Sequence, residues 1–240
     1  MTISAYKAVK GIGKEISEDS YHVDSENGIF IVADGMYGDG LGKTASQTAV
    51  QVIATLLQTV TYESSLVGSY YEDAFILERI KEAFEKANEK VLELKALGTT
   101  VVLAYVLGDK VFVAHAGDSR AYLVRENNIE QLTEDHSLIA AAIKMGDITV
   151  EEARKSPHKD ILTRALGRMN HHHDIKAINW QEGDAFLLTT DGLTEVLNNN
   201  EIKNTIVSCN DMQVVCDRLV EAAKSKEAED DITMIVFRVG

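Results

Sequence analysis

Acidic residues recur at the ends of apolar runs in this sequence. The runs 28–33, 113–117 and 187–190 are each followed by an aspartate, and an aspartate pair directly precedes the run that begins at residue 232. With one acidic pair upstream, these acids are Asp34, Asp118, Asp191, Asp230 with Asp231, and Glu18 with Asp19. Carboxylates at strand ends that meet one another would repel unless cations lay between them. Hard oxygen ligands favour Mg²⁺ or Mn²⁺, so the pattern indicates a divalent metal site.

Glycine follows two of these aspartates, Asp34 and Asp191. It permits a sharp turn and a close approach of the backbone to a ligand, so a carbonyl oxygen could join the carboxylates in coordination. A single Asp-Gly after a strand is more simply an ordinary turn. Four strand ends of the same design together favour the metal interpretation.

The hydrophobic periodicity predicts strands and helices in groups. We predict strands at 28–33, 99–107, 110–116, 120–125, 129–133, 184–190 and 232–239, and helices at 43–59, 73–95, 137–145, 150–155, around 200 and at 211–225. Connections as short as Gly108-Asp109 cannot make parallel crossovers, so the strands must pair antiparallel, which argues against a doubly wound nucleotide-binding sheet. The expected fold is α+β, with two stacked antiparallel sheets flanked by helices as an α-β-β-α sandwich.

Composition limits the classes of function. No linker-like segment divides the 240 residues, so we expect one domain over 1–240. The 38 acids against 24 bases give a formal charge of −14, which disfavours binding to nucleic acid or to anionic membranes. No apolar leader or membrane-length run is present, which predicts a cytoplasmic protein. The two cysteines, Cys209 and Cys216, suit core packing better than a disulfide or a zinc site.

Several spaced motifs occur in the order typical of one family. They are Ser17-Glu18-Asp19, Val32-Ala33-Asp34-Gly35-Met36, Gly98-Thr99-Thr100, Gly117-Asp118-Ser119-Arg120, Leu187-Leu188-Thr189-Thr190-Asp191-Gly192-Leu193 and Asp230-Asp231-Ile232-Thr233. With Leu132 to Ser137 and Leu162 to Gly167, they span nearly the whole chain. The sequence therefore resembles the PP2C (PPM) family of metal-dependent protein serine/threonine phosphatases, in its bacterial single-domain form. The resemblance implies the sandwich of two sheets that the element order also predicts.

The resemblance also implies roles for the acids. Asp34 would bridge two Mn²⁺ or Mg²⁺ ions, the Gly35 carbonyl would bind one of them, and Asp191 with Asp230 would complete the other. Glu18 and Asp19 would act mainly through bound water, and Asp118 would hold a third ion together with Asp191.

The implied reaction is hydrolysis without a phosphoenzyme, in which a water that bridges the two cations attacks phosphorus in line with the leaving serine or threonine oxygen. Asp34 would position that nucleophile. We expect phosphorylated proteins, modified by a Ser/Thr kinase, as substrates, and a monomer.

Three departures from the family pattern lie near the implied site. Lys14 stands where the family commonly has an arginine that grips the substrate phosphate, and Tyr37 and Asp39 replace the usual glycine and histidine. Lysine lacks the bidentate fork, so about 1–3 kcal/mol of phosphate positioning would be lost, with weaker binding or slower turnover. An alternative function is therefore a catalytically weakened domain that binds phosphoproteins or regulates a partner. A structural cation site in a binding module is a further alternative, which a calcium preference would favour.

Other features have simpler interpretations. The segment 138–160 falls where the family carries a flap beside the site, with Gly146 and Pro157 as hinges, and we expect it to shape substrate choice. Adjacent histidines alternate in direction, so the run 171–173 is better read as a solvated loop than as a metal site. We read the remaining candidates as a packed histidine, a locally oriented histidine, a structural ion pair and a packing residue, namely His115, His136, Arg120 and Trp180.

Overall fold

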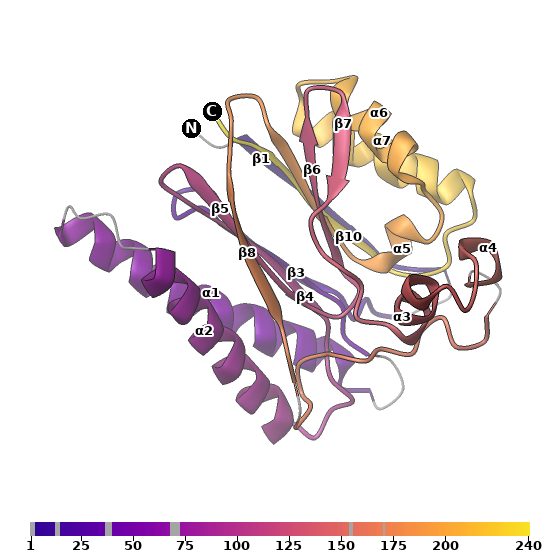
Figure 1. The fold of residues 1–240 in the computed structure, drawn as a ribbon, viewed down its shortest axis with the longest axis horizontal. Coiled ribbons are helices and arrows are strands. Elements are labelled where there is room, and N and C mark those ends of the chain that lie inside the picture. The colour runs from indigo at the N-terminus through magenta and orange to yellow at the C-terminus, as the bar shows by residue number, and fades with distance from the viewer. Residues whose placement is uncertain (1–2, 13–14, 37–39, 68–72, 154–155, 170) are drawn as a thin grey trace.

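Two five-stranded antiparallel sheets are stacked in the computed structural model, which describes residues 3–12, 15–36, 40–67, 73–153, 156–169 and 171–240. The strands are β1 (Ile3–Val9), β2 (Ser20–Asp24), β3 (Ile29–Ala33), β4 (Val101–Leu107), β5 (Lys110–Ala116), β6 (Arg120–Arg125), β7 (Asn128–Gln131), β8 (Asp174–Asn179), β9 (Ala185–Thr189) and β10 (Ile232–Arg238). One sheet has the order β1-β10-β9-β6-β7 and the other β2-β3-β4-β5-β8 (Figure 1). The first strand thus pairs with the last, with Ile3 opposite Arg238.

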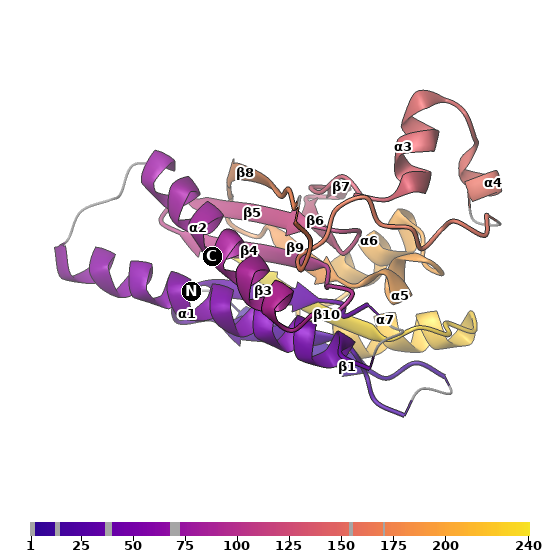
Figure 2. The same ribbon diagram turned by 90° about the horizontal axis from the view of Figure 1, so that it is seen from below.

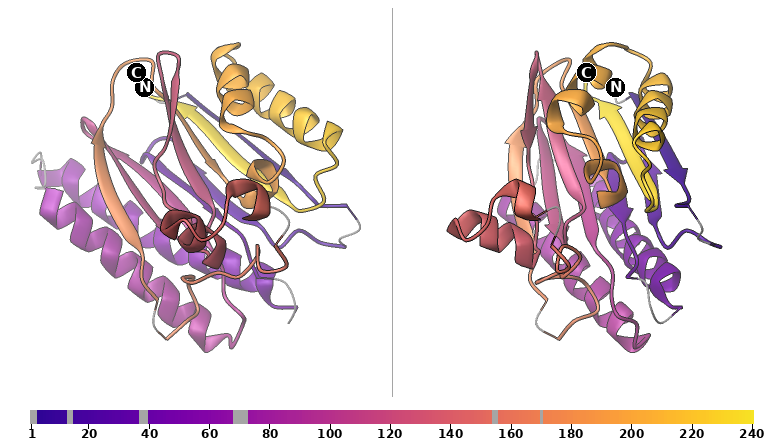
Figure 3. Two further views of the ribbon diagram at one scale, coloured as in Figure 1. Left: turned by 45° about the vertical axis from the view of Figure 1, so that its right-hand side comes forward. Right: turned by 90° about the vertical axis from the view of Figure 1, so that its right-hand side faces the viewer.

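Helices cover the outer faces of both sheets. The helices of the described chain are α1 (Gly42–Val67), α2 (Asp73–Glu93), α3 (Leu138–Met145), α4 (Val150–Ala153), α5 (Asp191–Thr194), α6 (Asn199–Val207) and α7 (Met212–Ser225). The long pair α1 and α2 covers the β3 sheet, and α6 and α7 lie against the β10 sheet, so the strands separate the two helical layers (Figure 3). None of the helices within the described ranges combines the length and apolar character that crossing a bilayer requires.

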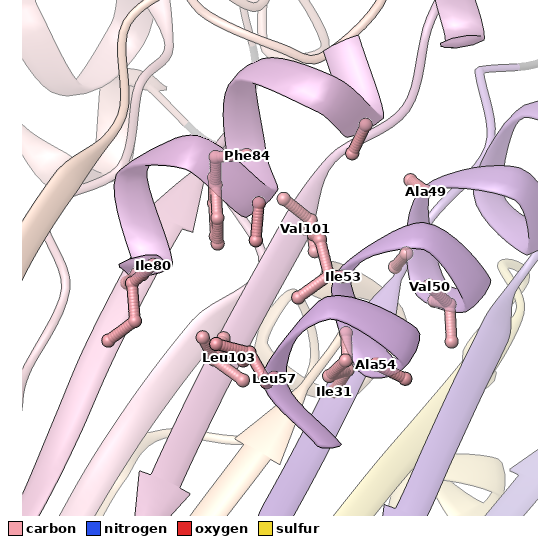
Figure 4. Close-up of a cluster of buried hydrophobic side chains, with 14 of the residues drawn as sticks. Ile31, Ala49, Val50, Ile53, Ala54, Leu57, Ile80, Phe84, Val101 and Leu103 are labelled. Carbon is pink, nitrogen blue, oxygen red and sulfur yellow. The ribbon is translucent and has the colours of Figure 1, made fainter. Parts of the chain in front are cut away.

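The layering follows from the two-residue period of the strands. In β3 every residue is buried, but alternate side chains face different layers. Ile31 packs with Ile53 and Leu57 of α1 (Figure 4), whereas Phe30 faces the other sheet and stacks on Phe237, with ring centroids 4.2 Å apart. A strand buried on both faces reads as a continuous apolar run, and each such Ile or Phe contributes about 1.5–3 kcal/mol by burial.

The segment from α3 to α4 projects from the body of the molecule (Figure 2). Helix α3 begins after Ser137, whose hydroxyl accepts a hydrogen bond from the Ala140 amide, and it ends at Gly146, whose φ is +80°. No residue of α3 is buried. Local capping therefore defines a helix that tertiary packing hardly stabilises.

The predicted α+β sandwich is confirmed, with differences in individual elements. Helix α1 continues to Val67, beyond the predicted end at 59, because no Gly or Pro interrupts 60–67. Strands β1, β2 and β8 and the short helix α5 were not predicted. All three strands lie at sheet edges, where mixed polar and apolar residues replace the continuous apolar runs of β3 and β9.

Candidate metal centre

The predicted acids lie at the ends of strands from both sheets. Asp34 directly follows β3, and Asp19 directly precedes β2. Asp191 opens α5 just beyond β9, and Asp230 lies two residues before β10. The Thr190 amide donates a hydrogen bond to the Thr233 carbonyl, which joins the β9 and β10 ends. Four chain segments from two sheets therefore converge at one end of the sandwich.

Electrostatics shows that these carboxyl groups face one another. Burial raises the pKa of Asp34 well above its usual range, and the charges of Asp19, Asp191, Asp230 and Asp118 raise it further. Burial likewise raises the pKa of Asp191, followed by the charges of Asp118 and Asp230. Burial raises the pKa of Asp19 to about 7 against a hydrogen bond from Thr190, and that of Asp118 to about 7. A divalent cation would relieve this repulsion.

The donor atoms fit a hard cation. The buried Oδ1 atoms of Asp19 and Asp191 accept no hydrogen bond from any described residue. Most buried carboxylate oxygens have a donor, so such atoms call for a ligand. The converging side chains offer only oxygen, the donor that Mg²⁺ and Mn²⁺ prefer.

The main chain around Asp34 is fixed by two threonines. The Thr100 amide and the Thr99 hydroxyl donate to the Asp34 carbonyl at 2.8 and 2.7 Å, and the Asp34 amide donates to the Thr100 hydroxyl at 3.0 Å. A Cβ at Gly35 would lie 2.0 Å from the Gly42 carbonyl oxygen, so only glycine fits there. The motif 98–100, which carried no assigned role in the sequence, thus holds the strand end that presents Asp34.

Asp231 holds the N-terminal acidic pair in place. Its Oδ1 accepts a hydrogen bond from the Gly11 amide at 2.6 Å and its Oδ2 one from the Glu18 amide at 3.0 Å. The adjacent Asp230 carboxylate accepts instead from the Asp231 amide at 2.7 Å. The two neighbouring aspartates therefore have different tasks, since Asp231 anchors the chain and Asp230 faces the other acids. The sequence grouped Asp231 with the other strand-end acids and gave it no role of its own.

Glu195 and Lys159 are near the site but were not predicted. The charge of Glu195 raises the pKa of Asp191 and of Asp118, after the larger effect of burial on each. Lys159 Nζ, which the segment after α4 supplies, lies 2.6 Å from Glu195 Oε1. Glu195 stands four residues after Asp191, one helical turn, which is a signal the sequence did contain. Nothing local in the sequence indicates that Lys159 reaches it.

The remaining candidates have mixed outcomes. Lys14, Tyr37 and Asp39 lie outside the described residues. Arg120 forms the expected structural ion pair, with its Nε and Nη2 at 2.8 and 2.6 Å from the Asp135 carboxylate. His115 is buried, as expected, and its Nε2 lies 2.8 Å from the Glu134 carbonyl oxygen.

Two residues read as packing or loop residues make specific contacts. The Trp180 indole packs against the inter-sheet core and donates to the Gly108 carbonyl at 3.0 Å. In the histidine run, the ring of His173 packs on Phe84 with centroids 4.9 Å apart.

Comparisons with known proteins connect the chain with one family of phosphatases. The model of the family described as Protein phosphatase 2C matches residues 13–234. A serine/threonine phosphatase, stp, of Listeria welshimeri is 32% identical over 229 residues, covering 90% of both chains. The structure of the S. agalactiae serine/threonine phosphatase has a TM-score of 0.89 at 27% identity and covers 100% of both chains. The catalytic domain of the phosphatase PstP, solved in complex with two manganese ions, shares the fold with a TM-score of 0.84 at 24% identity, over 99% of this chain and 97% of that one.

Proposed function

Since the chain belongs to the protein phosphatase 2C family and is a serine/threonine protein phosphatase, we propose that it hydrolyses phosphoserine and phosphothreonine in proteins directly, with divalent cations and without a phosphoenzyme. The observation that carries the proposal is the meeting of five carboxyl groups, in which the charges of Asp19, Asp191, Asp230 and Asp118 add to burial in raising the pKa of Asp34. Such a cluster is costly without cations and suits two or three of them.

Each acid has a place in the proposed centre. Asp34 and the Gly35 carbonyl would hold ions at the β3 end, and Asp191 with Asp230 would hold one at the β9 and β10 ends. Asp118 and Asp191 would share an outer third position, and Glu18 and Asp19 would act mainly through bound water. Mn²⁺ or Mg²⁺, when bound, would supply Lewis-acid activation of water and neutralisation of the phosphoryl charge. The relative PstP, solved with two manganese ions, supports this choice of metal.

The protein's own contribution is orientation. Because Thr99 and Thr100 fix the main chain at Asp34, its carboxylate would need little reorganisation to hold the cations and position the nucleophilic water. Lys14 would hold the substrate phosphate as a point charge. A thiol nucleophile is not needed, and Cys216 is unsuited to that role because burial in the core raises its pKa to about 12.

The wider assignment follows the family. We propose that residues 1–240 act as one domain, that the flap at 138–160 shapes substrate choice, and that the substrates are phosphoproteins made by a Ser/Thr kinase. The projecting α3, with no buried residue, supports a flap that can adapt to different partners. We further propose that the protein acts as a monomer.

The test is hydrolysis of phosphoserine and phosphothreonine peptides by metal-stripped protein supplied with Mn²⁺ or Mg²⁺. Asp34→Asn should lower kcat at least about 100-fold, because loss of a ligand should cost no less than loss of a residue that merely orients one. The matched control is Asp24→Asn, at the opposite end of β2 from the site, which should retain activity. When reactions with labelled phosphopeptide are quenched with acid, no label should be found covalently attached to the enzyme. Turnover by Asp34→Asn equal to that of the control would refute the proposed centre.

A weakened, phosphoprotein-binding function rests on Lys14, Tyr37 and Asp39 alone. If it holds, the wild type should bind Mn²⁺ yet turn over slowly, and Lys14→Arg should raise kcat/KM by about 10-fold or more, the equivalent of 1.4 kcal/mol. An unchanged kcat/KM in Lys14→Arg would argue against it.

A further inference from the structure

A chain of contacts outside the acidic cluster leads from β8 to the turn that carries Asp118. The His136 ring is 6% exposed and lies between Asp174, the first residue of β8, and Gly117. The Gly117 amide donates to His136 Nδ1 at 3.3 Å, and His136 Nε2 lies 3.0 Å from Asp174 Oδ2. The Asp174 carboxylate, the His136 imidazole and the backbone of Gly117, which directly precedes the candidate ligand Asp118, are thus linked in one line of hydrogen bonds.

The hydrogen-bond pattern fixes the tautomer of the ring. Burial lowers the pKa of His136 below its usual range, against the effect of Asp174, so the neutral ring carries one hydrogen. Because Nδ1 accepts from Gly117, that hydrogen must be on Nε2, from which it is donated to Asp174. Arg164 Nη1 lies 3.2 Å from His136 Nε2 and 3.0 Å from the other Asp174 oxygen. With the ring hydrogen on Nε2, the guanidinium donates to the carboxylate and not to the ring, and so keeps the carboxylate in place.

A metal ion on this cluster fits less well. One donor atom from each of His115, His136 and Asp174 lies within 4.8 Å of the other two. Coordination by His136 Nε2 would move the ring hydrogen to Nδ1, where it would face the Gly117 amide hydrogen, and the Arg164 guanidinium already supplies the positive charge at Asp174. The rings of His115 and His136 stack with centroids 4.4 Å apart, which supports packing of neutral imidazoles.

Only glycine fits at the Gly117 turn, and His136 holds the backbone of Gly117. Its φ is +108°, a conformation that side chains rarely adopt, and a Cβ there would lie 2.6 Å from the Thr100 side chain. His136 engages both polar groups of Gly117, because its own amide also donates to the Gly117 carbonyl at 3.0 Å. Asp118 follows directly, so the direction of its carboxylate depends on how this turn is held.

We propose that Asp174 and His136 are positioning residues for Asp118: Asp174 orients the His136 ring, and the ring and backbone of His136 hold the turn that aims the Asp118 carboxylate at the outer metal position. The inference rests on the proposed function. The His136 carbonyl also accepts from the Thr163 amide at 2.8 Å, and the Leu138 amide donates to the Ile161 carbonyl at 2.9 Å, so the same residue closes the base of the flap. The flap and the outer metal position therefore share one support.

The first experiment measures Mn²⁺ binding to metal-stripped protein by calorimetry, independently of turnover. Asp174 is 55% exposed, so Asp174→Ala should fold. We expect Asp174→Ala to weaken the lowest-affinity Mn²⁺-binding equilibrium about 10-fold, the effect typical of losing a residue that orients a metal ligand. The higher-affinity equilibria should be unchanged. The matched control is Glu130→Ala, another exposed strand carboxylate, which lies 3.9 Å from Lys176 and away from this line. Asp174→Asn, whose amide oxygen can still accept from Nε2, should restore much of the binding.

Two variants of His136 separate its contacts. His136→Asn keeps an acceptor near Nδ1 for the Gly117 amide, whereas His136→Gln keeps a group near Nε2 for Asp174. Hydrogen exchange of the Gly117 amide should stay slow in His136→Asn and become at least about 10-fold faster in His136→Gln. Equal exchange in both variants would overturn the role of Nδ1.

A double variant tests whether Asp174 acts through Asp118. Asp118→Asn should remove the weakest Mn²⁺ step, and adding Asp174→Ala should weaken the remaining steps no further. Additive losses, or an Asp174→Ala isotherm equal to that of Glu130→Ala, would overturn the inference alone. A wild type that neither binds Mn²⁺ nor hydrolyses phosphopeptides would overturn the proposed function as well. Uptake of one Zn²⁺ by the wild type but not by Asp174→Ala would overturn the hydrogen-bond assignment.

Discussion

Aspartates at strand ends occur in two contrasting environments in this protein. Asp184 is buried directly before β9, and Arg125 of β6 binds it with two hydrogen bonds, of 2.9 Å from Nε and 2.7 Å from Nη2. Asp34 and Asp191 face other carboxylates instead. The Asp184 carboxylate is neutralised by an arginine of the same chain, whereas Asp34 and Asp191 require positive charge from a bound cation. The partner of an aspartate, more than its burial, therefore separates structural acids from functional ones.

The largest effect is expected where a repelling acid is neutralised. Asp191→Asn should lower phosphatase activity at least about 100-fold while it raises the stability of the metal-free protein, because it removes one charge from the cluster. Activity assays with Mn²⁺ and thermal unfolding with a chelator test both parts. Destabilisation of the chelated variant would mean that Asp191 serves the fold as Asp184 does.

At Asp184, the acid paired with Arg125, we expect a loss of stability without a loss of activity. Arg125→Ala leaves the Asp184 carboxylate buried without its cation and should lower the free energy of unfolding by about 3 kcal/mol. Activity at temperatures where the variant is folded should be unchanged. Urea unfolding measures the first quantity, and loss of activity in the folded variant would contradict the contrast.

The pH dependence of stability should distinguish metal-free from metal-loaded protein. Burial raises the pKa of Asp19 and of Asp118 to about 7 in the folded chain, against about 4 when unfolded, so the folded chain binds these protons more tightly. Stability of the chelated protein should therefore fall as pH rises from about 4 to about 7, by on the order of 2 kcal/mol or more. Saturating Mn²⁺ should remove this decline. If the protein in chelator became more stable as pH rises over this range, the raised pKa values of Asp19 and Asp118 would be refuted.

The smallest effect is expected at Lys159, a cation near the cluster that the flap side supplies. Its ion pair with Glu195 is largely exposed, so Lys159→Ala should change the free energy of unfolding by less than about 1 kcal/mol. Removing this positive charge near Asp191 should tighten Mn²⁺ binding about two-fold. Lys159→Arg is the charge-conserving control. Weaker Mn²⁺ binding in Lys159→Ala would show that Lys159 orders the site instead of opposing the cation.

The sequence predicts the apolar layers and the strand-end acids because both are local patterns. The run 29–33 is apolar at every position and ends at Asp34, which indicates both a doubly buried strand and the acid that follows it. The sequence does not predict β8, because its residues are partly exposed and its partner β5 lies far earlier in the chain. Neither the Asp174–His136 contact nor the Lys159–Glu195 pair has a sequence signal, because each joins segments 36 or more residues apart.

The pairing of the first strand with the last has a consequence for the order of folding. Asp231 accepts hydrogen bonds from the amides of Gly11 and Glu18, which are 220 and 213 residues away in the sequence, and among the described strands β1 pairs with β10 alone. Contacts of such sequence separation form late and slowly. We expect the emerging chain to lack cation affinity until its last strand leaves the ribosome, so that bound ions slow unfolding more than they speed folding. A polypeptide still being synthesised would then be unable to dephosphorylate anything.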